Sequence, residues 1–137
     1  MPSTTLPLVR KYMDTKTHAL APDDDILAAV QRLINEGVTD APVLDAGGRL
    51  VGMLSEYDCL RLLSQGRDGN PPRGKVRDFM SEKVTVVPPT MDVYFVAGMF
   101  LAEPTQRRFV VVDGEQVAGV ITRKDVLRAV RTGLGEG

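Results

Sequence analysis

Apolar residues recur at intervals of three and four along residues 24–36, and again along residues 93–101. This spacing puts them on one face of an α-helix, so each stretch is predicted to be amphipathic and half-buried. Asp23 and Thr90 stand where a side chain would cap the start of each helix, and Gly37 stands where the first helix would end in the left-handed conformation. In the first helix the apolar positions are Ile26, Ala29, Val30, Leu33 and Ile34. Gly98 interrupts the second helix, which predicts close packing against a neighbour.

Short apolar runs separated by Asp and Gly follow each helix, a pattern typical of β-hairpins. An extended piece comes before each helix, and another short apolar helix comes after each hairpin. The extended pieces are 17–21 and 84–88, the hairpin strands are 41–44 with 50–54 and 109–112 with 117–121, and the last helices are 58–63 and 125–130.

The two halves are copies of one unit. A shift of 67 residues aligns 13–63 with 80–130 without a gap. Matched pairs include Met13 with Met80, Pro22 with Pro89, Asp25 with Asp92, Val43 with Val110, Gly47 with Gly114, and Gly52 with Gly119. We therefore predict an α/β (α+β) fold of two β-α-β-β-α repeats, residues 9–64 and 76–131, packed with pseudo-twofold symmetry and joined by a linker at 65–75.

Composition excludes several classes of function. The chain has 137 residues with 17 Lys and Arg against 18 Asp and Glu, a net charge of −1, which argues against a basic DNA-binding protein. One Cys and one His exclude a disulfide framework and an all-Cys/His zinc site. No apolar run is long enough to span a membrane, and no signal peptide is visible, so we expect a cytoplasmic protein.

The linker contains a sequence similar to a phosphate-binding P-loop, Gly69-Asn-Pro-Pro-Arg-Gly74-Lys75. Val76 stands where such a loop needs Ser or Thr for Mg²⁺, and proline has no N–H to offer a phosphate. We interpret the stretch as an exposed linker.

A polar motif ends each hairpin: Gly52-Met-Leu-Ser55-Glu-Tyr-Asp58 and Gly119-Val-Ile-Thr122-Arg-Lys-Asp125. One interpretation is a capping box, in which Ser or Thr and the Asp three residues later satisfy the start of a helix. The other is a ligand site, in which the helix start attracts phosphate, the Asp accepts hydrogen bonds from a diol, and the Gly leaves room for a ligand.

The doubled motif in doubled units resembles a tandem CBS-domain pair (a Bateman module) over residues 9–131. Residues Ala41-Pro42-Val43-Leu44-Asp45 are similar to a family segment whose Pro is missing from Arg108-Phe109-Val110-Val111-Val112. The resemblance implies adenosine-containing ligands bound in the cleft between the repeats: AMP, ADP, ATP, S-adenosylmethionine, NAD(H) or cyclic dinucleotides. It implies no catalytic cofactor and no metal.

By this resemblance, Ser55 and Thr122 would contact phosphate, and Asp58 and Asp125 would hold ribose. The residues expected to flank the base are Thr17, His18, Val84 and Thr85, with Asp40, Ala41 and Pro42 from 38–42 and Arg107, Arg108 and Phe109 from 105–109. The second copy is the more basic, because Arg123 and Lys124 lie inside its motif and Arg107 aligns with Asp40. We therefore expect phosphate to bind better at Thr122.

These features predict a regulatory nucleotide sensor. The alternative is a ligand-independent interaction module with the same fold. No Ser/His/Asp, Cys/His or metal-ligand set is visible, so we do not expect an enzyme. The tails are too short for an effector domain, so an unidentified effector protein is expected, as is a homodimer formed through the last helices. His18 and Cys59 also have purely structural interpretations.

Overall fold

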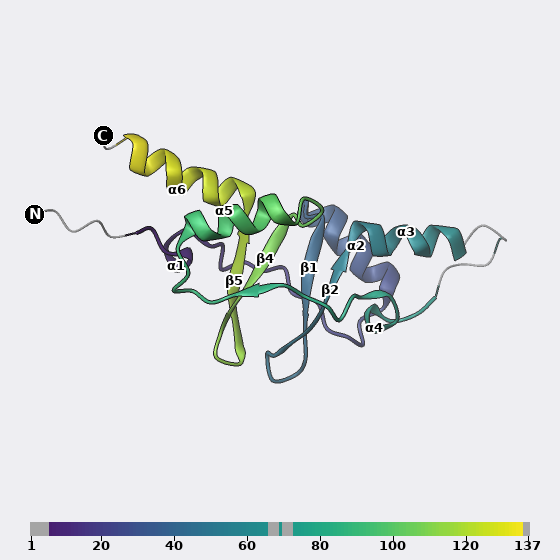
Figure 1. The fold of residues 1–137 in the computed structure, drawn as a ribbon. Coiled ribbons are helices and arrows are strands. Elements are labelled where there is room, and N and C mark those ends of the chain that lie inside the picture. The colour runs from purple at the N-terminus through teal and green to yellow at the C-terminus, as the bar shows by residue number, and fades with distance from the viewer. Residues whose placement is uncertain (1–5, 66–68, 70–72, 136–137) are drawn as a thin grey trace, which may run out of the picture. The chain divides into compact units, whose positions relative to one another are not determined.

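The computed structural model describes residues 6–65, 69 and 73–135, and its helices and strands form an α+β fold (Figure 1). The first half holds α1 (Val9–Tyr12), α2 (Ile26–Glu36), β1 (Asp40–Leu44), β2 (Leu50–Ser55) and α3 (Glu56–Gln65). The second half holds α4 (Val76–Phe79), β3 (Val86–Val87), α5 (Val93–Ala102), β4 (Arg108–Asp113), β5 (Gln116–Thr122) and α6 (Arg123–Gly135). Among the described residues, no helix combines the length and the apolar character that crossing a membrane requires.

The two long helices are capped two residues later than the sequence suggested. α2 is amphipathic as predicted, but α5 is apolar on its exposed face as well, with Tyr94, Phe95 and Leu101 exposed, so the prediction of an amphipathic second helix is wrong. Asp25 caps α2 by accepting a hydrogen bond from Ala28 N, and Asp92 caps α5 by accepting one from Phe95 N. The prediction of caps at Asp23 and Thr90 is therefore wrong. Gly37 ends α2 with φ 68°, as predicted, because a left-handed residue without a Cβ is unstrained there.

The acidic run before α2 is fully engaged in local structure. Asp23 forms ion pairs with Arg77 and Lys75 at 3.0 and 3.8 Å. Asp24 accepts a hydrogen bond from the Ala21 amide at 2.8 Å. Together with the Asp25 cap, these contacts give each of the three carboxylates a separate structural role.

The hairpins form as predicted and are antiparallel. In one sheet β1 pairs with β2, and Leu20 joins β1 as a single parallel bridge to Val43. In the other sheet, the order is β3-β4-β5, with β3 parallel to β4. The extended piece predicted before each helix is thus a strand in one half and a single bridge in the other.

Strand register corrects the gapless alignment of the repeats. Gly52 pairs with Val43, whereas Gly119, 67 residues later, pairs with Val111, which is 68 residues after Val43. The first hairpin strand is therefore offset by one residue, and the turn of the second hairpin is one residue shorter. As a result, Asp40 is equivalent to Arg108 and not to Arg107, because they lie opposite Ser55 and Thr122 respectively.

The chain forms two compact units that differ from the two sequence repeats. One unit contains residues 1–16 and 85–137, and the other contains 17–84. Each has its own apolar core. The first core is Val9, Val87, Val93, Val96, Phe100, Phe109, Val111, Ile121, Val126 and Ala129. The second is Leu20, Ile26, Ala29, Leu33, Ala41, Val43, Leu54, Leu62, Val76 and Phe79.

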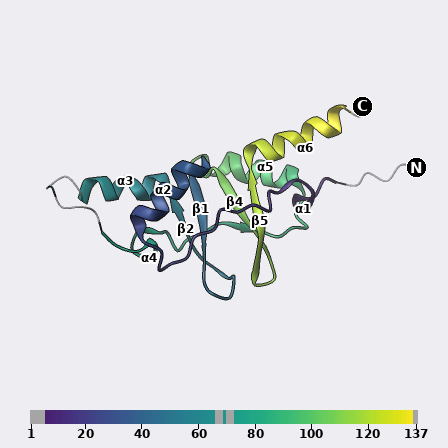
Figure 2. The same ribbon diagram turned by 180° about the vertical axis from the view of Figure 1, so that it is seen from behind.

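Each repeat donates its first residues to the unit built by the other repeat. We call these stretches, 7–14 and 74–81, the opening segments; each contains a four-residue helix that the sequence did not predict, α1 or α4. Seen from behind, the segment with α1 lies along β5 and α6 (Figure 2), where Asp14 N and Val120 N each bond to the other residue's carbonyl oxygen at 2.8 and 2.9 Å. Ser81 and Met53 make the equivalent pair at 2.9 Å in the other unit.

Gly98 does not pack as predicted. A Cβ built on this residue meets no atom within 4 Å, and the residue is exposed on α5. The predicted linker lies partly outside the described residues, which omit 66–68 and 70–72.

Candidate functional site

The first polar motif lies where β2 passes into α3. The Asp58 side chain accepts hydrogen bonds at Oδ2 from Ser55 N and Ser55 Oγ, both at 3.0 Å. Ser55 Oγ in turn accepts one from Asp58 N at 3.2 Å. These three bonds form a capping box that satisfies amide groups left without helical partners at the start of α3.

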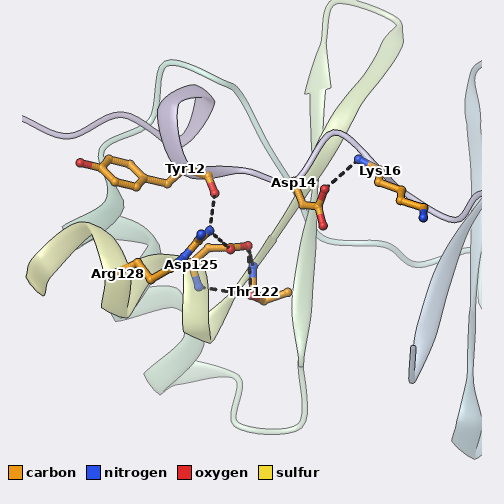
Figure 3. A network of polar contacts seen from close by, with 6 residues as sticks. All are labelled: Tyr12, Asp14, Lys16, Thr122, Asp125 and Arg128. Carbon is orange, nitrogen blue, oxygen red and sulfur yellow. Dashed lines mark hydrogen bonds and ion pairs between the residues drawn. The ribbon is translucent and has the colours of Figure 1, made fainter. Parts of the chain in front are cut away.

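The second motif has the same geometry where β5 passes into α6 (Figure 3). Asp125 Oδ2 accepts from Thr122 N at 2.9 Å and from Thr122 Oγ1 at 3.0 Å. Asp125 N donates to Thr122 Oγ1 at 3.3 Å. Asp125 is 7% exposed. The capping interpretation of the motif is therefore realised in both copies.

An arginine three residues after each Asp engages the other carboxylate oxygen. Arg61 Nη2 lies 3.5 Å from Asp58 Oδ1, and Arg128 Nη2 hydrogen-bonds to Asp125 Oδ1. Each guanidinium also donates to the end of a short helix: Arg61 to the Phe79 carbonyl at 2.6 Å, and Arg128 to the Tyr12 carbonyl at 3.3 Å. Figure 3 shows Arg128 between the Tyr12 carbonyl and the Asp125 carboxylate. Both arginines belong to the repeated Asp-x-Leu-Arg pattern, which is the signal in the sequence that could have indicated their role.

The motif glycines accommodate protein rather than ligand, which corrects the prediction. A Cβ on Gly52 would lie 2.5 Å from Met80 Sδ and 2.9 Å from the Ser81 carbonyl oxygen. A Cβ on Gly119 would lie 2.7 Å from the Asp14 carbonyl oxygen and 3.1 Å from Met13 Sδ. The space beside each glycine is thus filled by an opening segment.

Strand pairing brings some of the expected base-flanking residues to the motifs. Asp40 lies opposite Ser55, and Arg108 lies opposite Thr122. Asp40 is 7% exposed and accepts a hydrogen bond from Thr39 Oγ1 at 3.1 Å. Phe109 is fully buried and stacks on Phe100 in its own core, with ring centroids 4.3 Å apart. Ala41 and Pro42 are buried in β1, and Arg107 is exposed just before β4.

Arg123 binds the protein's own backbone. Its Nη2 donates to the carbonyls of Pro104 and Gln106, the latter at 3.0 Å. Its guanidinium carbon lies 5.9 Å from the ring centroid of Phe100. This arginine therefore fastens the loop after α5 to the start of α6, while its neighbour Lys124 is exposed.

The remaining expected residues lie on the extended pieces. Thr17 and His18 belong to the unit 17–84, as does Val84, while Thr85 begins the second part of the other unit. His18 has a left-handed backbone with φ 56°. Its Nδ1 lies 3.3 Å from Glu36 Oε2, an ion pair when the ring is protonated, without the geometry of a hydrogen bond.

Cys59 follows Asp58 on α3 and is half-buried. Burial raises the pKa of the Cys59 thiol, and the negative charges of Asp58 and Glu56 raise it further. The thiol therefore stays protonated at neutral pH. In the part of the chain that the structure describes, no three His, Cys, Asp or Glu side chains group in a way that could hold a metal ion.

A family model and several known proteins match this chain, and they agree on one family. The model of the CBS domain matches residues 9–65 and again 76–132. The chloroplastic CBS domain-containing protein CBSX1 from Arabidopsis thaliana is 30% identical in an alignment 149 residues long, which covers 88% of this chain and 63% of that protein. An A-adding tRNA nucleotidyltransferase from Aquifex aeolicus is 29% identical over 126 residues, 92% of this chain and 15% of that enzyme. The chain thus spans less than two thirds of these relatives.

Solved structures show the same fold. The structure of CBSX2 in complex with AMP superposes with a TM-score of 0.80, at 29% identity, and covers 93% of this chain and 98% of that one. A putative acetoin utilization protein from Vibrio cholerae gives a TM-score of 0.83 at 20% identity, covering 96% and 95%. The chain therefore belongs to the CBS-domain family and carries two CBS domains in tandem.

Proposed function

We propose that this protein is a regulatory module that binds an adenosine-containing nucleotide at its two Ser/Thr-x-x-Asp motifs. The observation that carries the proposal is the identical geometry of the two motifs in a chain similar to a CBS-pair protein crystallised with AMP. Two copies of one arrangement, each at the start of a helix of ten or more residues, offer the positive end of a helix dipole and a carboxylate to a phosphorylated nucleoside.

The carboxylate of the motif Asp can accept one more hydrogen bond, such as one from a ribose hydroxyl. A carboxylate has about four lone-pair positions. In the described residues, Asp125 Oδ2 accepts two hydrogen bonds from Thr122, and Oδ1 accepts one from Arg128. A ribose hydroxyl donating to Oδ1 would use the fourth position without breaking the capping box.

A bound nucleotide changes a conformational equilibrium only by the difference in its affinity for the two states. We therefore expect the readout to be a change in assembly or in the binding of an effector protein. No group arranged for acid–base or nucleophilic chemistry enters the proposal, so we expect binding without turnover.

The direct test is calorimetric titration of the purified protein with AMP, ATP, NADH, S-adenosylmethionine and cyclic di-AMP, together with mass spectrometry of nucleotide released on denaturation. At least one ligand should bind with micromolar affinity and raise the melting temperature. Asp58→Asn and Asp125→Asn serve as variants, because Asn keeps the Oδ acceptor of the capping box but loses the charge. Neither heat nor a thermal shift with any of the five ligands would contradict the proposal.

A second function, ligand-independent association, is favoured by the apolar side chains that the last helices leave exposed. Leu60 and Leu63 on α3 are 57% and 69% exposed, and Leu127 on α6 is 67% exposed. Burial of such side chains would stabilise a homodimer. Light scattering at micromolar concentration should then give twice the chain mass with or without nucleotide, and Leu63→Glu or Leu127→Glu should lower it.

A further inference from the structure

The opening segments are joined to the motif carboxylates by one arginine in each unit. Arg128 lies on α6, three residues after Asp125, and donates through the same Nη2 to Asp125 Oδ1 and to the carbonyl of Tyr12, the last residue of α1. Arg61 makes the equivalent contacts in the other unit: its Nη2 donates to the carbonyl of Phe79, the last residue of α4, and forms an ion pair with Asp58 Oδ1 at 3.5 Å. The same contacts thus form twice, between equivalent atoms of independent parts of the chain.

The chemistry of the contacts explains why arginine stands there. Residues three apart on a helix face the same side, so Arg128 reaches Asp125 without bending its helix. The last carbonyls of a helix have no helical donor, and a four-residue helix such as α1 satisfies few of its own. A guanidinium is permanently charged and offers several N–H groups, so it can hold a carboxylate and a carbonyl together.

The segment that Arg128 holds is also attached along its length by backbone hydrogen bonds, among them Arg10 N to the Pro89 carbonyl and Val93 N to the Pro7 carbonyl, both at 2.9 Å. It bonds through Val9 N to the Met91 carbonyl at 2.8 Å and through Asp14 to Val120, and it inserts the fully buried Val9 into the core. Its backbone crosses Gly119 where no side chain would fit. The motif, its glycine and the opening segment therefore make one continuous contact surface within the unit.

We propose that Arg128 and Arg61 are positioning residues that lock each opening segment to the motif Asp, so that docking of the segment and nucleotide affinity at that Asp depend on each other. The inference rests on the proposed nucleotide function and adds a coupling to it. With the segment docked, Arg128 fixes the carboxylate in the orientation that leaves the fourth acceptor position of Asp125 to a ribose hydroxyl. Because such coupling is reciprocal, bound nucleotide must also hold the segment more firmly.

The test is hydrogen exchange of the free and AMP-saturated protein, with AMP affinity measured in parallel. Arg128→Met removes the charge and keeps most of the apolar stem, and Arg131→Met on the same helix is the matched control. In the free protein, Arg128→Met should speed exchange of the Val9 and Asp14 amides about fivefold or more and leave unchanged the amides that bond β4 to β5. In the wild type, AMP should slow exchange of the same two amides.

The coupling predicts a further set of results. Arg128→Met should weaken AMP binding about five- to tenfold and abolish the slowing of exchange by AMP. Arg128→Lys, which keeps the charge, should recover most of the affinity. Arg61→Met should act in the same way on the Met53 and Ser81 amides of the other unit.

The outcomes separate this inference from the proposed function. Unchanged exchange in Arg128→Met, or wild-type AMP affinity despite faster exchange, would overturn the coupling. Absence of binding by the wild type with all five ligands of the calorimetric titration would count against both nucleotide binding and the coupling to it, whereas faster exchange in the variant would still support the lock itself. Equal effects of Arg128→Met and Arg131→Met on exchange and affinity would mean that both variants act through the loss of a surface charge, and would overturn the lock.

Discussion

Gly119 lies directly against the backbone of Asp14: a Cβ on the glycine would be 2.7 Å from the Asp14 carbonyl oxygen. That oxygen also accepts the hydrogen bond from Val120 N, so it cannot move away without losing the bond. Gly119→Ala should therefore destabilise the protein by about 2 kcal/mol or more, the usual scale for overpacking at a rigid contact. Urea unfolding of the variant measures the loss.

Gly52 provides the matched comparison in the other unit. The nearest atom to its added Cβ is Met80 Sδ at 2.5 Å, the end of a flexible side chain, and the nearest backbone atom is the Ser81 oxygen at 2.9 Å. Gly52→Ala should thus cost less than Gly119→Ala, by about 1 kcal/mol. Equal midpoints for the two variants and the wild type would show that the opening segments do not pack this tightly.

Gly98 should respond in the opposite direction. It lies inside α5, and nothing within 4 Å would meet its added Cβ. Alanine has less backbone freedom in the unfolded chain, so Gly98→Ala should raise the free energy of unfolding by about 0.5–1 kcal/mol. Thermal unfolding checks the sign, and a destabilised variant would mean that the site is occupied, for example by another copy of the chain.

The sequence predicted the larger elements because their apolar spacing is long enough to carry information. Residues 24–36 and both hairpins contain several turns or alternations, and all form where expected to within two residues. The helices α1 and α4 have four residues each, too few to show a period. They exist because Val9, Val76 and Phe79 are buried by the other repeat, which is information that no local pattern holds.

At the candidate site, the motif itself could be predicted but its surroundings could not. The capping box depends on residues three apart and is therefore local. The carbonyl groups that Arg61 and Arg128 bind lie 18 and 116 residues away along the chain. The atoms that pack against the motif glycines are also distant in the sequence. The one-residue offset between Asp40 and Arg107 escaped the alignment because the intervening turn compensates for it further along the chain.

Two variants can test which residue caps α2: Asp25, as in the structure, or Asp23, as the sequence pattern suggested. Asp25 accepts from Ala28 N at 3.1 Å, whereas Asp23 makes exposed ion pairs with Lys75 and Arg77. Asp25→Ala should cost about 1 kcal/mol, as the loss of an N-cap does. Asp23→Ala should cost less than about 0.5 kcal/mol, since exposed ion pairs contribute little. Urea midpoints of the two variants give the comparison, and the reverse order would restore Asp23 as the cap.

The Cys59 thiol should react slowly. Burial, followed by the charges of Asp58 and Glu56, raises its pKa, and the thiolate is the reactive form. At pH 8, alkylation of Cys59 by iodoacetamide should be slower than that of glutathione, because a smaller fraction of the thiol is ionised. The raised pKa also contributes to the free energy of unfolding. This contribution is complete below the pKa of the thiol in the unfolded chain and is lost as the pH rises through the pKa in the folded protein. Cys59→Ser should remove this alkaline loss, and an unchanged pH profile would contradict it.

The two motifs should differ in their affinity for phosphate because their cross-strand neighbours have opposite charge. Arg108 lies opposite Thr122, whereas Asp40 lies opposite Ser55. Arg123 binds the carbonyls of Pro104 and Gln106, so we assign most of the difference to this cross-strand pair.

A partly screened charge on the neighbouring strand changes the free energy of phosphate binding by about 0.5–1 kcal/mol. The contrast between a cation beside one motif and an anion beside the other therefore favours the Thr122 motif by roughly fivefold or more. AMP titrations should therefore lose the tighter site in Asp125→Asn and keep it in Asp58→Asn. Adenosine is the control, because without a phosphate it should show little preference. If Asp58→Asn removes the tighter AMP site instead, the cross-strand charges do not set the preference; a preference of the same size for adenosine would assign it to the base or the ribose.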